Sequence, residues 1–468
     1  MYKERIGQIV FIIIVYLFSS ATAFSLTINS QNDAYYDYAQ LNKSANESTF
    51  LAITDIHLNN ANTSPVTYGQ DSGIELWNNV KNKMADIINE RDPKFVVLLG
   101  DLPNHNDLFN LQTNIAAVLT GISGLNAISK KNIPVFYAFG NNDSLENNYG
   151  PYVFEGQNLF ALDAEHSSPA TKGWPTLNAN PDCSVSPTFA CTYTITSPMP
   201  ATHIADMAHV MSDGYYSAYP LGSKIPLRLI SLNTVIFSRN SLITGSAQLD
   251  AVQTEMDWLE NQLASAKANN EFVYIIMHIP VGMDAFYNLD DHDMWNSTLI
   301  LNNGLRFRDA FLATMEKYKT NIRAVLSGHT HENELRALYS SKTLKEISVL
   351  DLGVPGVTPS HFNNPAMQVY LFDNTFQLNE IKTYYTTPTP TNWKIYSFLN
   401  DYNCPKNSTI FFCVSLKILP QLPIWKLKPQ PLIDNPYELN YPVRAPDYNP
   451  SPSNWLAILD AIQVIPVE

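Results

Sequence analysis

Short apolar runs that end abruptly in polar side chains recur between residues 50 and 331. The runs are FLAIT, FVVLLG, IPVFYAFG, FVYIIM and IRAVLSG, and each is followed at once by Asp, Asn or His. Runs of this length and composition predict β-strands. Stretches with helical spacing separate several of them, most clearly at 249–266, where apolar residues recur every three or four positions. The alternation predicts an α/β fold whose strand ends deliver polar side chains to one edge of a sheet.

The residues at these strand ends are of the types that bind divalent transition metals. Carboxylate and amide oxygens combined with imidazoles suit a pair of such ions. One Asp or His after a strand would be weak evidence, because a capped turn needs the same residue types, but the set together predicts a dinuclear site. Its members are Asp55, His57, Asp101, Asn141, His278, His329 and His331.

The order of these motifs, D-x-H, G-D, G-N, H and G-H-x-H, is similar to that of the calcineurin-like metallophosphoesterase superfamily. Within it, GDLPNH at 100–105 resembles the G-D-x-P-x-H of acid sphingomyelinase-like phosphodiesterases, as do HIPVG at 278–282 and the downstream NNPAMQVYLFD. The resemblance covers about residues 50–373. It implies a four-layer αββα sandwich and a metal-dependent phosphoric ester hydrolase.

The resemblance also implies roles for the strand-end residues. Asp55, His57 and His331 would bind one metal, Asn141, His278 and His329 the other, and Asp101 would bridge them. The metals would be zinc, with iron or manganese as alternatives, and a hydroxide between them would attack the phosphorus. His105, in GDLPNH, would lie beside the phosphate and donate a proton to the leaving group.

The sequence departs from the superfamily pattern at Asn142. The usual motif is G-N-H-[DE], and its His is a candidate proton donor, whereas this chain has FGNND. An amide can donate a hydrogen bond to a phosphate oxygen but cannot act as a general acid. Asn142 therefore favours substrates with good leaving groups, unless His105 alone supplies the proton. No catalytic role is expected for the remaining histidines, of which His292 is the one nearest the expected substrate entrance; they are His166, His203, His209, His292 and His361.

The leading hypothesis is hydrolysis of a phosphodiester or a nucleotide-type anhydride, in a small molecule or a lipid head group. An endopolyphosphatase-like hydrolase is an alternative, although the net charge of −14 disfavours a long polyanion and nucleic acid alike. A third hypothesis is a protein that keeps the metals and binds a phosphate-bearing ligand without turnover.

The N-terminus predicts export. Lys3 and Arg5 precede an apolar stretch, and Ala21-Thr22-Ala23 has the small residues of a cleavage site, so residues 1–23 are expected to be a signal peptide. No later stretch is expected to span a membrane. The close pairs Cys183/Cys191 and Cys404/Cys413 could form local disulfides in a secreted, periplasmic or lysosome-like compartment. The predicted domains are a catalytic domain at 24–385 and a Pro-rich extension at 386–468 that wraps over it.

Overall fold

The computed structural model describes residues 47–105, 109–129, 133–156, 158–159, 203–210, 212–284, 293–344, 346–389, 392–427 and 459–467. All of these residues belong to one structural unit, Ser44–Glu468. The predicted signal peptide, the Cys183/Cys191 pair, His166 and His292 lie outside the described residues.

A six-stranded mixed sheet holds the N-terminal motifs. Its order is β15-β14-β13-β1-β4-β5. The strands β1, β4 and β5 run parallel, so their carboxyl ends lie at the same edge, whereas β13, β14 and β15 continue the sheet antiparallel from β1. The bounds are β1 Ser48–Ile53, β4 Val96–Leu98, β5 Val135–Tyr137, β13 Ala366–Phe372, β14 Leu378–Tyr385 and β15 Lys394–Ser397.

An eight-stranded mixed sheet holds the remaining motifs, in the order β16-β11-β12-β10-β9-β8-β7-β6. Its central strands β8, β9, β10 and β12 are parallel. The bounds are β6 Ile204–Asp206, β7 Tyr216–Ala218, β8 Leu227–Ser231, β9 Phe272–Ile276, β10 Ile322–Ser327, β11 Leu335–Leu338, β12 Val349–Gly353 and β16 Gln463–Val464. A separate parallel pair joins β2 (Leu58–Asn59) to β3 (Ser72–Gly73).

Aromatic side chains pack the two large sheets against each other. Phe50 of β1 stacks on Tyr370 of β13, with ring centroids 4.8 Å apart, and contacts Tyr274 of β9 at 5.5 Å. The Tyr274 hydroxyl donates to the Phe376 carbonyl at 2.7 Å, so the polar end of this buried ring is satisfied. These contacts hold the two sheets face to face.

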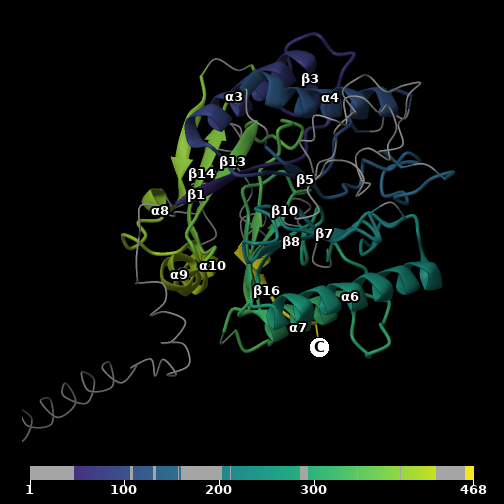
Figure 1. The fold of residues 1–468 in the computed structure, drawn as a ribbon, viewed down its shortest axis with the longest axis vertical. Coiled ribbons are helices and arrows are strands. Elements are labelled where there is room, and N and C mark those ends of the chain that lie inside the picture. Colours follow the sequence, from purple (N-terminus) through teal and green to yellow (C-terminus); the bar gives the residue numbers. More distant parts are fainter. Residues whose placement is uncertain are drawn as a thin grey trace, which may run out of the picture. The chain divides into compact units, whose positions relative to one another are not determined.

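Helices cover the outer face of each sheet (Figure 1). The helices α3 (Ile74–Arg91) and α4 (Leu111–Ser129) lie over the six-stranded sheet, and α6 (Gly245–Ala268) and α7 (Phe307–Tyr318) lie over the eight-stranded one. The expected apolar face of α6 is buried, including Val252, Met256, Leu259 and Leu263. The predicted αββα arrangement is confirmed.

The segment after Tyr385 contributes to both sheets. It supplies β15 and β16, with α8 (Phe398–Asp401), α9 (Ile410–Cys413), a π-helical segment (Val414–Ile418), a 3₁₀-helix (Leu419–Gln421) and α10 (Leu422–Leu427) between them. Residues 394–397 form β15 because the open edge of β14 supplies hydrogen-bond partners. The predicted domain boundaries stay predictions.

One stretch after the predicted signal peptide has membrane-like composition, contrary to expectation. Ile410–Leu427 is long and apolar enough to cross a membrane by length and composition, and 33% of it is buried. Core helices of soluble proteins can have the same length and composition. Leu422 and Trp425 pack into the core, and Cys404 and Cys413 form a disulfide at its start.

Candidate functional site

The strand ends of both sheets meet at one place. The loops after β1, β4 and β5 and those after β9 and β10 all begin at carboxyl ends of parallel strands. The structure brings together every predicted metal ligand, and each of them is buried or nearly so. They are Asp55 and His57 after β1, Asp101 after β4, Asn141 after β5, His278 after β9, and His329 and His331 after β10.

The side chains form two groups that share Asp101. In the first, His57 Nε2 lies 3.4 Å from Asp101 Oδ2, and His331 Nε2 lies 3.3 Å from Asp55 Oδ1. Asp55, His57 and Asp101 offer ligand atoms within 4.8 Å of one another.

In the second group, His278 Nε2 lies 3.3 Å from Asp101 Oδ2 and 2.9 Å from Asn141 Oδ1. His329 joins Asp101 and His278 in a set whose ligand atoms also lie within 4.8 Å. Asp101 therefore belongs to both groups.

The backbone at the site is strained. Five of the candidate ligands have positive φ, a conformation that residues other than glycine adopt rarely and at a cost of order 1–3 kcal/mol. Strain of this kind persists where the surrounding structure enforces it, and it concentrates at functional sites. The five are Asp55 (49°), His57 (43°), Asp101 (55°), His329 (73°) and His331 (61°).

Two glycines allow the strand ends to approach this closely. A Cβ on Gly140 would lie 2.2 Å from Asp101 N and 2.4 Å from its Oδ1. A Cβ on Gly328 would lie 2.2 Å from Thr54 Oγ1. The glycines of FGNND and SGHTH are thus required by contacts between different strands.

Hydrogen bonds fix the orientation of the imidazoles. His57 Nδ1 lies 3.0 Å from the Pro103 carbonyl, and His278 Nδ1 contacts the Leu99 carbonyl at 2.5 Å. A carbonyl only accepts, so Nδ1 carries the proton in both rings and Nε2 is directed toward the carboxylates. This is the usual arrangement of histidines that bind metals.

Buried polar atoms without a hydrogen-bond partner also favour a bound cation at this site. Asp55 Oδ1 and His57 Nε2 are buried and have no hydrogen-bond partner among the described residues. A buried acceptor left without a partner costs about 1–3 kcal/mol. A metal ion contacting both atoms would remove that cost.

Burial and neighbouring charges shift the pKa values of the histidines and carboxylates at the site. Burial lowers the pKa of His278, but the charge and hydrogen bond of Asp101 outweigh it and raise the pKa to about 9. Burial opposes ionisation of Asp101 too, yet His278 and His57 hold its pKa well below the usual range. Burial lowers the pKa of His329 to about 3, and that of His331 also falls, so both stay neutral and able to bind a metal.

Asp143 supports Asp101 and was not anticipated. Its carboxylate accepts hydrogen bonds from four donors within 2.9 Å: the backbone N–H groups of Asp101, Leu102 and Gly140 and the hydroxyl of Tyr137. Burial and the charge of Asp101 raise the pKa of Asp143 to about 6. It is the last residue of FGNND, so its proximity to the motif was the available signal.

Asn142 is engaged with Asp101. Its backbone N–H donates to Asp101 Oδ1 at 2.8 Å, and its side-chain Nδ2 donates to Oδ2 at 2.8 Å. Asn142 also borders the cavity described below. Its amide therefore holds the carboxylate that both groups share.

His105 lies beside the first group. Its ring stacks on that of His57 with centroids 3.7 Å apart, and its Nδ1 lies 2.7 Å from Asp71 Oδ1. The ring of His361 stacks on that of His331, with centroids 3.9 Å apart. His361, for which no role was expected, thus belongs to the site region; no spacing in its sequence, SHFNNP, links it to the other motifs.

A cavity of about 390 Å³ opens over these side chains. Asp101, His105, Asn141, His329 and His331 line its floor. Apart from Asn142 and Thr330, which belong to FGNND and SGHTH, its other lining residues come from loops without a recognisable motif. Those additional residues are Asn142, Asn148, Tyr149, Ser238, Arg239, Asn240, Asp284, Asp293, Met294, Thr330 and His361.

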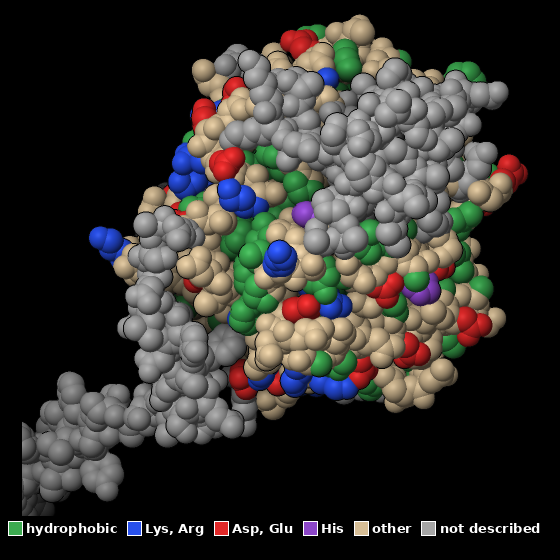
Figure 2. Space-filling view, viewed as in Figure 1, with side chains coloured by type: hydrophobic (Ala, Val, Ile, Leu, Met, Phe, Trp, Pro, Cys, Tyr) green, Lys and Arg blue, Asp and Glu red, His purple; other side chains and the backbone are tan. Residues whose placement is uncertain are grey.

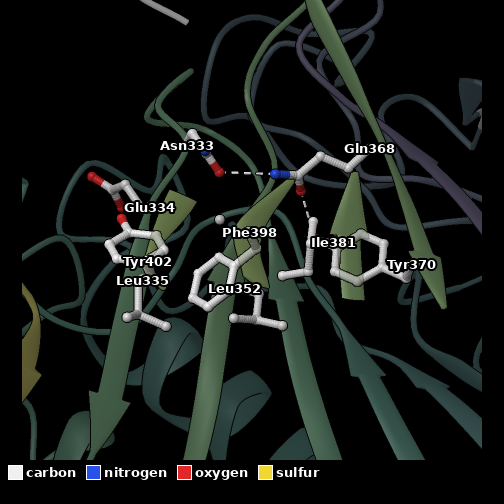
Figure 3. Close-up of a pocket in the computed structure, with 10 residues that line it drawn as sticks. Asn333, Glu334, Leu335, Leu352, Gln368, Tyr370, Ile381, Phe398 and Tyr402 are labelled. Atoms are coloured by element: carbon white, nitrogen blue, oxygen red, sulfur yellow. Dashed lines mark hydrogen bonds between the residues drawn. The ribbon is translucent and has the colours of Figure 1, made fainter. Parts of the chain in front are cut away.

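None of these residues lines a second cavity, where Gln368 Nε2 donates to Asn333 Oδ1 at 2.8 Å (Figure 3). Its volume is about 10 Å³. This is room for about one water molecule, so the large cavity is the candidate substrate site.

Known proteins resemble this chain. Residues 48–333 match the family described as calcineurin-like phosphoesterase. The "Sphingomyelinase phosphodiesterase D" of Dictyostelium discoideum is 29% identical over 175 residues, 37% of each chain. The "Sphingomyelinase phosphodiesterase C" of the same organism is 24% identical over 441 residues, 88% of this chain and 85% of that protein.

The human "Cyclic GMP-AMP phosphodiesterase SMPDL3A" is 26% identical over 321 residues, 65% of this chain and 58% of that protein. This chain thus covers less than two thirds of the length of the first and third of these relatives. The resemblance predicted from the motifs is confirmed. Since the family match covers more than half of the 468 residues, the chain belongs to the calcineurin-like phosphoesterase family.

Proposed function

We propose that this chain is an exported two-metal phosphodiesterase whose substrates are small phosphodiesters or nucleotide-type anhydrides. Its family makes it a metal-dependent phosphoric ester hydrolase. The observation that carries the finer proposal is the shared carboxylate of Asp101, which lies 3.4 Å from His57 and 3.3 Å from His278 on the floor of the cavity.

The first metal would be held by Asp55, His57, Asp101 and His331, and the second by Asp101, Asn141, His278 and His329. Two such ions supply an activated water and neutralise phosphoryl charge. The unpartnered Asp55 Oδ1 and His57 Nε2 support this arrangement. Oxygen and imidazole ligands are compatible with zinc, iron or manganese.

His105 would protonate the leaving group. The contacts of Asn142 with Asp101 favour a supporting role for the amide, which cannot supply a proton. His105 borders the cavity and has a carboxylate partner, as general acids commonly do. An alcohol leaving group would depend on this proton more than an aryl or phosphate leaving group.

The lining of the cavity favours a polar substrate. Tyr149 and Met294 are the only large apolar side chains among its described lining residues. The others carry polar or charged groups. This suits a nucleotide or a head group better than acyl chains. The relatives described above are named as a cyclic GMP-AMP phosphodiesterase and as sphingomyelinase phosphodiesterases.

An endopolyphosphatase-like activity has less support. Lys and Arg side chains are interspersed with Asp and Glu on the described surface seen in Figure 2, which shows no continuous basic stripe there. A long polyanion needs such a stripe, and the net charge of −14 opposes its approach.

The test is a substrate panel with the purified mature protein. It would contain bis(p-nitrophenyl) phosphate, a cyclic dinucleotide, a nucleoside triphosphate, sphingomyelin and polyphosphate, each with zinc, manganese or iron and after chelation. We expect metal-dependent diesterase turnover that chelation abolishes and added metal restores. Metal binding without turnover of any member would instead identify a binding protein, and preference for polyphosphate would favour the alternative enzyme.

Export has independent support from the Cys404–Cys413 disulfide, because disulfides persist in oxidising compartments. Expression in a secreting host followed by N-terminal sequencing should recover a chain that starts near Phe24. A product that keeps residues 1–23 and stays in the cytosol would contradict the proposal.

A further inference from the structure

Asp71 holds His105 by two hydrogen bonds. Its Oδ1 lies 2.7 Å from His105 Nδ1, and its Oδ2 accepts the backbone N–H of His105 at 2.9 Å. The Asp71 side chain is 19% exposed and that of His105 is 30% exposed, so water competes little for these contacts. One carboxylate thus fixes both the ring and the main chain of the residue that borders the cavity.

The local fold brings these distant residues together. Asp71 directly precedes β3, and β3 pairs with β2 through Leu58 and Ser72. Leu58 also bridges to Pro103, in the segment that carries His105. Its backbone N–H donates to the Leu102 carbonyl at 2.9 Å, and its carbonyl accepts from Asn104 N at 3.1 Å. The short strand β2, immediately after His57, therefore aligns the Asp71 segment on one side and the His105 segment on the other.

The contact selects one form of the imidazole. An ionised carboxylate only accepts hydrogen bonds, so the proton on Nδ1 is directed to Asp71 and Nε2 is the nitrogen left for the cavity. Burial opposes ionisation of Asp71, but the His105 hydrogen bond and the charges of His57 and His105 outweigh it and lower the pKa of Asp71.

We propose that Asp71 is a positioning residue that fixes the tautomer and orientation of His105, so that Nε2 faces the departing oxygen of the substrate. Asp71 itself does not touch the substrate. This inference rests on the proposed function, because it gives His105 its partner in the same reaction. Nothing in the spacing of the sequence motifs indicated Asp71.

A second histidine–carboxylate pair provides a matched control. His209 Nδ1 lies 2.8 Å from Asp213 Oδ2, and the His209 side chain is 31% exposed. Neither residue lines the cavity. Asp213→Asn makes the same carboxylate-to-amide change beside a histidine, at a position with no expected part in the reaction.

The kinetic test is a double-mutant cycle with Asp71→Asn and His105→Ala. The substrates are a dinucleoside monophosphate, which has an alcohol leaving group, and bis(p-nitrophenyl) phosphate. We expect Asp71→Asn to lower kcat on the dinucleoside by about 10- to 100-fold with KM unchanged, and to have a smaller effect on the aryl ester. In the His105→Ala background it should cause no further loss, and Asp213→Asn should match the wild type. The inference would be overturned if Asp71→Asn lowered kcat equally on both substrates. It would also be overturned if the effects of the two single substitutions on kcat multiplied in the double variant.

The spectroscopic test does not depend on turnover. In protein labelled with ¹⁵N-histidine, long-range correlation spectra distinguish the two neutral tautomers, and His105→Ala assigns the signal. We expect His105 to carry its proton on Nδ1 in the wild type and a changed tautomer ratio in Asp71→Asn. A wild-type proton on Nε2 would overturn the inference even if the variant does not fold. Wild-type protein without any diesterase turnover would refute the proposed function, and the spectra would still decide the role of Asp71.

Discussion

Asp101 is the residue on which both proposed metals depend. It lies between His57, which follows a strand of one sheet, and His278, which follows a strand of the other. Asp101→Ala is therefore expected to remove both metals and abolish turnover, whereas Asp55→Ala should remove mainly one. Plasma mass spectrometry of the purified variants measures metal per chain. Full metal content in Asp101→Ala would contradict the bridging assignment.

His278 gives the metal-free protein a predictable pH dependence. Its pKa is raised to about 9 in the folded chain, against an ordinary value of 6.5, because of its contact with Asp101. A raised pKa contributes stability that is fully present below 6.5 and is lost as the pH rises through about 9. The melting temperature of chelated protein should fall across that window.

His278→Gln is the control for this measurement, because it lacks the titrating group and should show a weaker fall. Metal affinity is expected to change in the opposite direction, since a metal needs the neutral imidazole and competes with its proton. A melting temperature that rises between pH 6.5 and 9 would contradict the assignment.

The residues that sequence could identify are those whose position follows from a strand. Asp55, Asp101 and His278 each come directly after a buried run, so their convergence could be predicted without knowing any contact. Asp71 and His361 reach the site through loops, and only their contacts with His105 and His331 reveal them. The wall of the cavity is unpredictable for the same reason.

At the scale of elements, the Cys404–Cys413 disulfide ties the turn after α8 to the end of α9. The two cysteines are nine residues apart. A loop of that length stabilises a fold by about 2–3 kcal/mol through the entropy of the unfolded chain. Cys404→Ala/Cys413→Ala should lower the free energy of unfolding by about this amount, measured by urea titration. Reductant should change the wild type more than the variant, and equal stability of the two would contradict the estimate.

Helices were predicted better than the edges of the sheets. The helix α6 has an apolar face in its own sequence, so its existence and its central part, 249–266, follow from local pattern, although the helix runs from Gly245 to Ala268. The four residues of β15 have no such pattern, and they form a strand because β14 offers an unpaired edge. The open edge of another strand decides such strands, and the pattern of their own residues does not reveal it.

The segment after Tyr385 is expected to be indispensable for a soluble fold. Its strands β15 and β16 pair with β14 and β11, the strands next to the edge of each sheet. Removal of residues 386–468 would expose both edges, and exposed edges promote aggregation. We expect the truncated chain to be found in the insoluble fraction after expression.

A second deletion distinguishes the loss of the two strands from the shortening of the chain. Lys426 Nζ lies 2.8 Å from Asp460 Oδ1, so the two ends of the 428–458 stretch can be joined by a short Gly/Ser linker. The linked chain keeps β15 and β16 and should stay soluble. Insolubility of both chains, or solubility of both, would contradict the role given to the two strands.

The pairing of β16 with β11 also sets an order of events during synthesis. The strands β1 and β4 can pair soon after they leave the ribosome, but the outer edge of β11 has no partner until Gln463 and Val464 have been made. About 125 residues separate β11 from β16, so at roughly 5–20 residues per second that edge stays open for about 6–25 seconds on each nascent chain. An open edge can pair with other chains, so the yield of active protein should depend on chaperones that bind nascent strands as well as on the stability of the finished fold.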